Sequence, residues 1–378
     1  MLFICFLLSF ISQTTARHYP PFTYTTVPTY VQASNRTGLF NTDALNYLIK
    51  QKFIVLDSDQ GVNSSPINSN AESKIIAAAK QIKTYAKLHN VQAVPDIYMY
   101  SQIDYSRTLY SAGKWFEQHP QYLLHNMDGS LASEPQGHIY DHQQKIVQQK
   151  WASTIANPVL NSDGALNGVF IDGYRYETNH SNGYLFLGNV SNATAYRWMK
   201  GTQESSAVLR SMLPLSKYTI INNPGVYSSK GADGIMIETF FPSDSGIQEL
   251  IQEVATGRIV QVHSAVNKAP YLNNTHQLWA FEVTLAGFLC GMGDYSYFGG
   301  GVEWGNVTNW MQPHVDYKRV LGKPTGNAKR INMKNGSWLY TRSFRNENNG
   351  ITNVSHQTSP LASCIQWSDG SISNSGLC

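Results

Sequence analysis

Short apolar segments alternate with amphipathic helical segments along most of this 378-residue chain, and this alternation constrains its fold more than any other feature. Phe53–Leu56 is a continuous apolar run of strand length. The helix predicted after Asn70 carries apolar residues at steps of three and four, at Ile75, Ala79 and Ile82. Repeated alternation of this kind is typical of a parallel sheet, because parallel neighbours need a crossover helix between them.

Eight segments have the composition of such strands. They are Phe53–Leu56, Val91–Tyr100, Tyr122–His125, Gly168–Asp172, Tyr218–Asn222, Gly234–Glu238, Arg258–His263 and Tyr295–Phe298. Eight strand–helix units close an α/β barrel of the (β/α)8, or TIM, type. The alternative is an open doubly wound sheet, but no strand is followed by a GxGxxG or GxxxxGK[ST] phosphate-binding loop. We therefore predict a TIM barrel over residues 17–337.

The predicted helices are bounded by turn residues. One lies around Arg107–His119, one begins after Asp141 as N-cap and stops at Pro158, and the others span about Ala193–Leu213, the residues after Ser245, and Thr275–Leu289. The connection between Asn223 and Gly234 is too short for a helix.

The pattern changes after residue 337, where we predict a small β extension over residues 338–378. Trp338–Arg345 and Cys364–Ser368 have strand composition, and Cys364 and Cys378 close a short loop that we expect to be a disulfide. Cys290 lies in an apolar context and is expected to be a buried small residue. Neither a CxxC pair nor an HExxH motif is present, so we predict no metal site and no cofactor.

Composition and targeting signals indicate an exported protein. Charged residues make up only 14% of the chain and the net charge is +3, which does not indicate a nucleic-acid partner. Met1–Ile11 is apolar and is followed by small polar residues, so we predict a signal peptide over residues 1–16; a buried N-terminal strand is the alternative. The longest other apolar stretch, Leu278–Gly291, contains Glu282, so stable membrane insertion is not expected.

Sites for N-glycosylation agree with export to the extracellular space or an endomembrane lumen. The N-x-S/T asparagines are Asn35, Asn63, Asn179, Asn189, Asn192, Asn273, Asn306, Asn335 and Asn353.

Two predicted strands share one pattern: a glycine, three apolar residues and then an acid. These strands are Gly168–Asp172 and Gly234–Glu238. The functional side chains of parallel barrels lie at the carboxyl ends of the strands, so Asp172 and Glu238 are expected to emerge at one mouth. A pair of acids is what glycosidic cleavage needs, since one protonates the leaving oxygen and the other attacks or activates water. The structural alternative is that Asp172 caps a turn and Glu238 pairs with a surface base.

The roles of the two acids follow from their surroundings in the sequence. Met236, Phe240 and Phe241 flank Glu238 and favour its protonated form, so Glu238 is predicted as the acid and Asp172 as the nucleophile or base. The reverse assignment, and retention or inversion at the anomeric carbon, stay open at this stage.

Other polar and aromatic residues at strand ends are predicted to bind substrate hydroxyls and ring faces. They are Asp57, Asp59, Tyr98, Tyr100, Tyr174, Arg175, Asn222, His263, Asp294 and Tyr295.

Several motifs together resemble the hypothetical glycosyl hydrolase families, a set of secreted eukaryotic proteins with TIM barrels. These motifs are VFIDG at Asp172, IMIETF at Glu238, GMGDYSYFGGG, LGKPTG and the run Ile365–Gly370. The resemblance runs from about Pro28 to the end of the chain and implies hydrolysis of an O-glycosidic bond by the strand-end acids. The run Asp57–Gly61 departs from the Glu-Lys pair and Trp-Gln-Gly turn that relatives carry, which leaves the role of Asp57 open.

The sequence therefore predicts a secreted glycoside hydrolase acting on a poly- or oligosaccharide. A carbohydrate-binding protein on the same barrel without catalysis is the main alternative, and a structural extracellular protein is the third. The oligomeric state is not predicted.

Overall fold

The computed structural model describes residues 19, 22–64, 70–173, 189–223, 231–264, 275–300, 307–311 and 314–378. The predicted signal peptide lies outside these residues, as do Tyr174 and Arg175.

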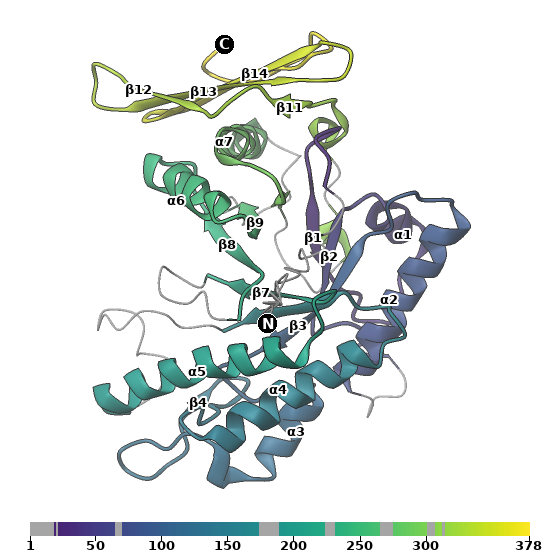
Figure 1. Ribbon diagram of the computed structural model, residues 1–378, viewed down its shortest axis with the longest axis vertical. Coiled ribbons are helices and arrows are strands. Elements are labelled where there is room, and N and C mark those ends of the chain that lie inside the picture. The colour runs from purple at the N-terminus through teal and green to yellow at the C-terminus, as the bar shows by residue number, and fades with distance from the viewer. Residues whose placement is uncertain are drawn as a thin grey trace, which may run out of the picture.

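A parallel barrel forms the centre of the molecule (Figure 1). Its strands follow one another around the sheet in chain order: β1 (Tyr30–Ala33), β2 (Phe53–Leu56), β3 (Asp96–Gln102), β6 (Gly168–Asp172), β7 (Tyr218–Asn222), β8 (Gly234–Phe240), β9 (Ile259–Ser264) and β10 (Ser296–Gly299). A parallel bridge between Thr29 and Phe298 joins the last strand to the first, and the Phe298 amide donates to the Pro28 carbonyl at 2.9 Å. The predicted TIM barrel is confirmed.

The predicted set of eight strands is wrong in two places: it misses one barrel strand and includes a segment that is not one. The first barrel strand, β1, was not predicted, because it has only four residues and one of them is the polar Gln32. Tyr122–His125 does not enter the barrel: Pro120–Tyr122 is a 3-10 helix (η1), and Leu123 makes an isolated antiparallel bridge to Tyr140. Strands β2 and β3 are therefore the second and third strands of the barrel, whereas the sequence predicted them as the first and second.

The helices lie outside the barrel sheet (Figure 1). Within the described residues they are α1 (Thr42–Leu48), α2 (Ala71–Leu88), α3 (Ser111–Glu117), α4 (Lys145–Leu160), α5 (Asn192–Met212), α6 (Asp244–Ala255), α7 (Thr275–Gly291) and α8 (Val307–Trp310). The side chains of Ser191 and Ser243 cap α5 and α6 by accepting from backbone amides.

Helix α4 differs from its predicted bounds at both ends. Its N-cap is Gln144, and the predicted cap Asp141 instead accepts hydrogen bonds from the side chains of Gln143 and Gln144. Pro158 lies inside the helix, which continues to Leu160.

The barrel interior is filled by aromatic side chains from several strands. The rings of Phe53 and Tyr98 lie 4.2 Å apart, and Phe53 also stacks on Tyr297 at 5.7 Å. This packing explains the glycine that opens β6, because a Cβ at Gly168 would lie 2.6 Å from the Tyr98 ring. A Cβ at Gly234, which opens β8, would likewise lie 2.6 Å from the Ile259 carbonyl oxygen. The glycines of the repeated pattern thus allow close packing inside the barrel.

An antiparallel sheet covers α7 on the side away from the barrel (Figure 1). It contains β11 (Lys323–Pro324), β12 (Lys329–Asn332), β13 (Trp338–Arg345), β14 (Ile351–Thr358), β15 (Leu361–Gln366) and β16 (Ile372–Ser375). Two of its strands thus precede residue 338, where we predicted the extension to begin. A separate hairpin pairs β4 (Ser133–Glu134) with β5 (Gly137–His138).

The three described cysteines have the states that the sequence predicted. Cys364 and Cys378 form a disulfide, with their Cα atoms 5.1 Å apart. Cys290 is buried in α7 and has no disulfide partner, and burial raises its pKa to about 12. The thiol is therefore unreactive at neutral pH, as expected of a small core residue.

Candidate active site

The carboxyl ends of the barrel strands carry a ring of polar side chains. Strands β1, β3, β6, β7, β8 and β9 each place at least one there, and the residue after β2 adds another: Gln32, Asp57, Gln102, Asp172, Asn222, Glu238 and His263. Polar groups concentrated at this end of a parallel barrel mark its functional face.

Asp172 and Glu238 meet at this face through a shared neighbour, Asn222. The Asn222 side-chain nitrogen donates to Asp172 Oδ1 at 2.9 Å and to Glu238 Oε2 at 2.9 Å. Two bonds of this length from one atom place the two oxygens at most about 6 Å apart, which is within reach of a two-carboxylate mechanism. Both acids are half-buried, whereas Asn222 is buried.

Asp172 accepts hydrogen bonds from three groups. The Tyr100 hydroxyl donates to Oδ2 at 2.6 Å, and Oδ1 accepts from the Gly173 amide at 2.8 Å as well as from Asn222. Burial, together with the nearby charges of Asp172 and Asp57, raises the pKa of Tyr100 well above its ordinary value, so the phenol keeps its proton. All three neighbours complement a carboxylate, which can only accept.

Glu238 is held by an asparagine pair at the end of β7. Its Oε2 accepts from Asn223 Nδ2 at 3.0 Å in addition to Asn222, and its backbone amide donates to Asn223 Oδ1 at 2.9 Å. Asn223 has a φ of 41°, a left-handed conformation that asparagine adopts more readily than most residues. The Glu238 carbonyl accepts from His263 Nδ1 at 3.0 Å, so His263 positions the β8 backbone.

Asp57 and Asp59 extend the site beyond Tyr100. Asp57 is buried and accepts from Gln32 Nε2 at 2.8 Å, and burial raises its pKa. Asp59 lies 3.8 Å from the guanidinium of Arg107, which itself lies 5.9 Å from the centre of the Tyr100 ring. These residues form one connected wall beside the catalytic candidates.

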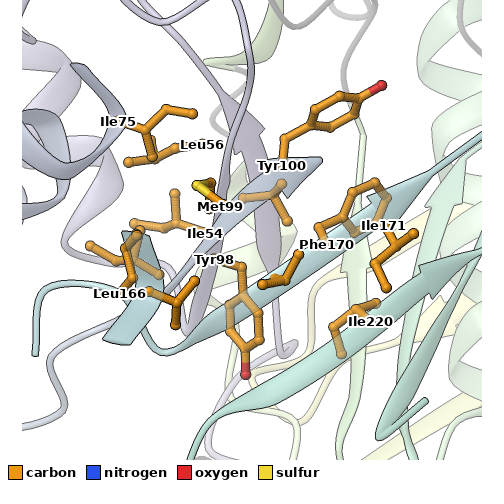
Figure 2. Close-up of a cluster of buried hydrophobic side chains, with 14 of the residues drawn as sticks. Ile54, Leu56, Ile75, Tyr98, Met99, Tyr100, Leu166, Phe170, Ile171 and Ile220 are labelled. Atoms are coloured by element: carbon orange, nitrogen blue, oxygen red, sulfur yellow. The ribbon is translucent and has the colours of Figure 1, made fainter. Parts of the chain in front are cut away.

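Three predicted site residues do not lie at this mouth. Tyr98 is fully buried in the barrel interior, and Figure 2 shows its hydroxyl pointing away from that of Tyr100. The Tyr100 hydroxyl is the one that donates to Asp172. The prediction was wrong because β3 continues to Gln102, so Tyr98 lies near its start. Asp294 and Tyr295 precede β10 and so lie at the amino ends of the strands, opposite the acids.

Two of the polar residues at the carboxyl ends of the strands, Gln102 and Gln32, were not predicted from the sequence. Gln102 Oε1 lies 2.5 Å from the Tyr100 hydroxyl, and it follows Tyr100 by two residues on the same inward face of β3. Gln32 belongs to the unpredicted strand β1. Period-two alternation beyond the predicted end of β3 was the available signal for Gln102.

The structure also limits other kinds of site. In the part of the chain that the structure describes, His, Cys, Asp and Glu side chains do not gather in groups of three that could hold a metal ion. Among the described helices, none has both the length and the apolar composition needed to cross a membrane.

Fold and site together define a TIM barrel with paired acids at the carboxyl ends of its strands, the arrangement found in glycosidases. The sequence profile of hypothetical glycosyl hydrolase family 15 matches residues 89–347, more than half of the chain. The protein belongs to this family, which confirms the resemblance read from its motifs. Among curated protein sequences, none matches the chain.

Solved structures with a similar fold include glycosidases. An α-amylase from Lactobacillus plantarum has a TM-score of 0.52 at 10% identity, with 90% of each chain covered. A glycoside hydrolase family 36 α-galactosidase from Geobacillus stearothermophilus has a TM-score of 0.47 at 10% identity, and the match covers 91% of this chain. The chain spans about half the length of that α-galactosidase, 49%. At 10% identity the likeness to the α-amylase shows the fold alone.

Proposed function

We propose that the protein hydrolyses O-glycosidic bonds of a poly- or oligosaccharide, with Asp172 as nucleophile, Glu238 as acid and base, and no cofactor. The observation that carries this proposal is the Asn222 amide that binds both carboxylates. A separation of about 5–5.5 Å between the carboxyl groups is typical of retaining enzymes, and a wider gap of about 6.5–9.5 Å is typical of inverting ones. The limit of about 6 Å between the bridged oxygens, Asp172 Oδ1 and Glu238 Oε2, is compatible with the retaining spacing, and we propose retention.

The hydrogen bonds support this assignment of roles to the two acids. Glu238 Oε2 accepts two N–H groups, which occupy both of its lone pairs, so a transferable proton belongs on Oε1. Asp172 Oδ1 also accepts two N–H groups. Among the described residues Oδ2 accepts from the Tyr100 hydroxyl alone, which leaves one lone pair for attack. The apolar residues that first favoured this assignment contribute less, because Phe241 is 52% exposed.

The reaction then takes two steps. Asp172 Oδ2 bonds to the anomeric carbon while Glu238 Oε1 gives its proton to the departing glycosidic oxygen. In the second step Glu238 takes a proton from water, the water oxygen bonds to the anomeric carbon, and Asp172 leaves as a carboxylate. No oxidant or reductant is consumed, and Glu238 recovers its proton.

The direct test is the stereochemistry of the products. The purified protein is incubated with a panel of glycans, and the first anomer released from any cleaved glycan is followed by proton NMR. We expect the anomer of the substrate. Release of the opposite anomer would contradict Asp172 as nucleophile, and no cleavage of any glycan that the protein binds would favour the non-catalytic carbohydrate-binding alternative.

We also propose that the protein is exported and N-glycosylated. The disulfide between Cys364 and Cys378 supports an oxidising compartment, and several N-x-S/T asparagines are exposed, including Asn335 in the turn before β13 and Asn353 on β14. Expression in a eukaryotic host with and without residues 1–16, followed by enzymatic removal of N-glycans, tests both parts. Retention of the full-length chain in the cytosol, or no change in mobility after deglycosylation, would contradict them.

A further inference from the structure

A pocket of about 980 Å³ lies at the amino end of the barrel, opposite the catalytic acids. Its walls come from residues 22–25, from the turn Asp294–Tyr295 before β10, and from one edge of the C-terminal sheet. We call it the amino-end pocket. Its size is typical of sites that bind small ligands.

Backbone pairing holds these walls in place. The Gly322 amide donates to the Tyr24 carbonyl at 2.8 Å and the Leu321 amide donates to the Thr25 carbonyl at 3.2 Å, so the N-terminal segment runs along the sheet edge. Lys323 pairs with Arg345 across β11 and β13. The pocket is therefore preformed, because ladder hydrogen bonds fix the elements around it.

One side of the pocket is aromatic. The Phe22 ring lies 4.9 Å from Tyr24 and 5.6 Å from Tyr295, and all three side chains are only partly buried. The Tyr24 hydroxyl donates to Asp294 Oδ1 at 2.9 Å, which fixes this carboxylate beside the rings while Asp294 itself stays exposed. A fixed acceptor next to aromatic faces suits a ligand with both hydroxyls and C–H faces.

The opposite side carries charges of both signs. Lys323, Arg345 and Glu347 are exposed and line the pocket, and none of them forms an ion pair with another described residue. Together with Asp294 they give two positive and two negative groups. A balanced set of donors and acceptors favours a neutral polyhydroxylated ligand over a polyanion or an anionic lipid surface.

We infer that the amino-end pocket is a second, non-catalytic saccharide-binding site, which holds one part of a polymeric substrate while another part reaches the acids. The inference rests on the proposed function for the identity of the ligand. Its independent support is the pocket itself, since aromatic rings, a fixed carboxylate and charges without an ion-pair partner among the described residues converge there from three separate parts of the chain.

Hydrogen–deuterium exchange on the full chain carrying Asp172→Asn tests this inference, since the probes are then not consumed. The probes are maltoheptaose, cellohexaose, xylohexaose and stachyose at millimolar concentration. We expect at least one of them to slow amide exchange in residues 22–25 and 320–325. Protection confined to the carboxyl-end loops, or none with any probe, would overturn the inference.

Variants connect the protection to the pocket. Arg345→Ala removes an exposed side chain and is expected to weaken the protecting interaction about tenfold, which corresponds to about 1.4 kcal/mol. Phe22→Ala removes an aromatic face and should weaken it at least as much, whereas Lys329→Ala on the neighbouring strand β12 should not. Equal protection in all three variants would place the ligand elsewhere.

Turnover of the same probes by the unsubstituted protein separates this inference from the proposed function. Protection of residues 22–25 without any turnover would support the pocket and contradict the hydrolase. Turnover without protection of residues 22–25 would support the hydrolase and contradict the saccharide site in the amino-end pocket.

Discussion

The Asn222 side-chain nitrogen lies 2.9 Å from Glu238 Oε2. The same nitrogen donates its second hydrogen to Asp172, so one neutral amide fixes the spacing of two acids that come from different strands. Because Asn222 sits on β7, between β6 and β8, the bridge follows from the order of the strands. The spacing of the two acids therefore depends on the arrangement of three adjacent barrel strands.

Replacement of the two acids by their amides should separate their roles. Asp172→Asn is expected to reduce turnover of every substrate by several orders of magnitude, because the attacking oxygen is lost. Glu238→Gln should reduce turnover of natural glycans as strongly, yet spare the first step with dinitrophenyl glycosides, whose leaving group needs no proton. Burst kinetics with the activated substrate measure this step.

Thermal unfolding provides the control for these variants. Each amide has nearly the shape of the acid it replaces, so the melting temperature should change little, as it should in the surface variant Asp163→Asn. If Glu238→Gln lost activity equally on natural glycans and on activated substrates, the role of Glu238 as the acid would be contradicted.

The variants Asn222→Ala and Asn223→Ala are predicted to differ in activity. Asn222→Ala removes one hydrogen bond from each acid, whereas Asn223→Ala removes one from the Glu238 carboxylate and one from the Glu238 backbone amide. A hydrogen bond to a charged group contributes about 1.5–3 kcal/mol, so kcat/KM should fall about 10- to 150-fold in Asn222→Ala.

Activated substrates again distinguish the two positions. With dinitrophenyl glycosides the first step of Asn223→Ala should recover toward the unsubstituted rate, whereas that of Asn222→Ala should not, because Asp172 is still unsupported. Recovery in both variants would show that Asn222 acts only through Glu238.

The repeated strand pattern carried most of what the sequence could predict about the site. Gly168–Asp172 and Gly234–Glu238 place acids at the ends of buried strands, and a parallel barrel brings such ends together whatever the intervening sequence. The bridge by Asn222 could not be predicted in the same way. It depends on the register of β7 against β8, which pairs Asn222 with Met236 and is set by packing in the barrel interior.

The failed predictions share one cause: a local sequence pattern does not show how a segment pairs with other strands or which end of the barrel it reaches. Strand β1 is four residues long and has no distinctive composition, so it becomes recognisable only when its neighbour β2 is in place. Asp294 and Tyr295 adjoin a strand that was correctly found, but they precede it. The direction of a parallel strand decides which end of the barrel a neighbouring residue reaches, and these two residues line the amino-end pocket instead.

Tyr100 and Tyr98 form a matched pair for a third prediction. Tyr100→Phe removes the phenol that donates to Asp172 Oδ2 and should lower the rate of the first step about 10- to 150-fold, as expected for a hydrogen bond to a charged group. Tyr98→Phe removes a buried hydroxyl that has no partner among the described residues, so activity and stability should hold. Equal activity loss in both variants would indicate general disruption of the barrel interior.

Two buried histidines, His142 and His356, predict how stability depends on pH. Burial lowers the pKa of each to about 4, and each donates from Nε2 to a backbone carbonyl. In the unfolded chain the pKa is about 6.5, so between about pH 4 and 6.5 the unfolded state binds the proton and the folded state does not. Their contribution to the free energy of unfolding is therefore complete above this range and is lost as the pH falls through it, by about 1.4 kcal/mol per pH unit for each histidine.

Urea unfolding at about pH 5 and about pH 6 measures this slope, in the native chain and in the double variant His142→Gln and His356→Gln. Burial raises the pKa of Asp96 to about 6, which acts in the opposite direction, but Asp96 is present in both proteins and cancels in the comparison. The native chain should gain about 2 kcal/mol more than the variant over this unit of pH, since most of one proton per histidine is taken up only on unfolding. The difference between slopes is independent of any uniform destabilisation by the substitutions, so equal slopes would show that the two histidines are already protonated in the folded protein.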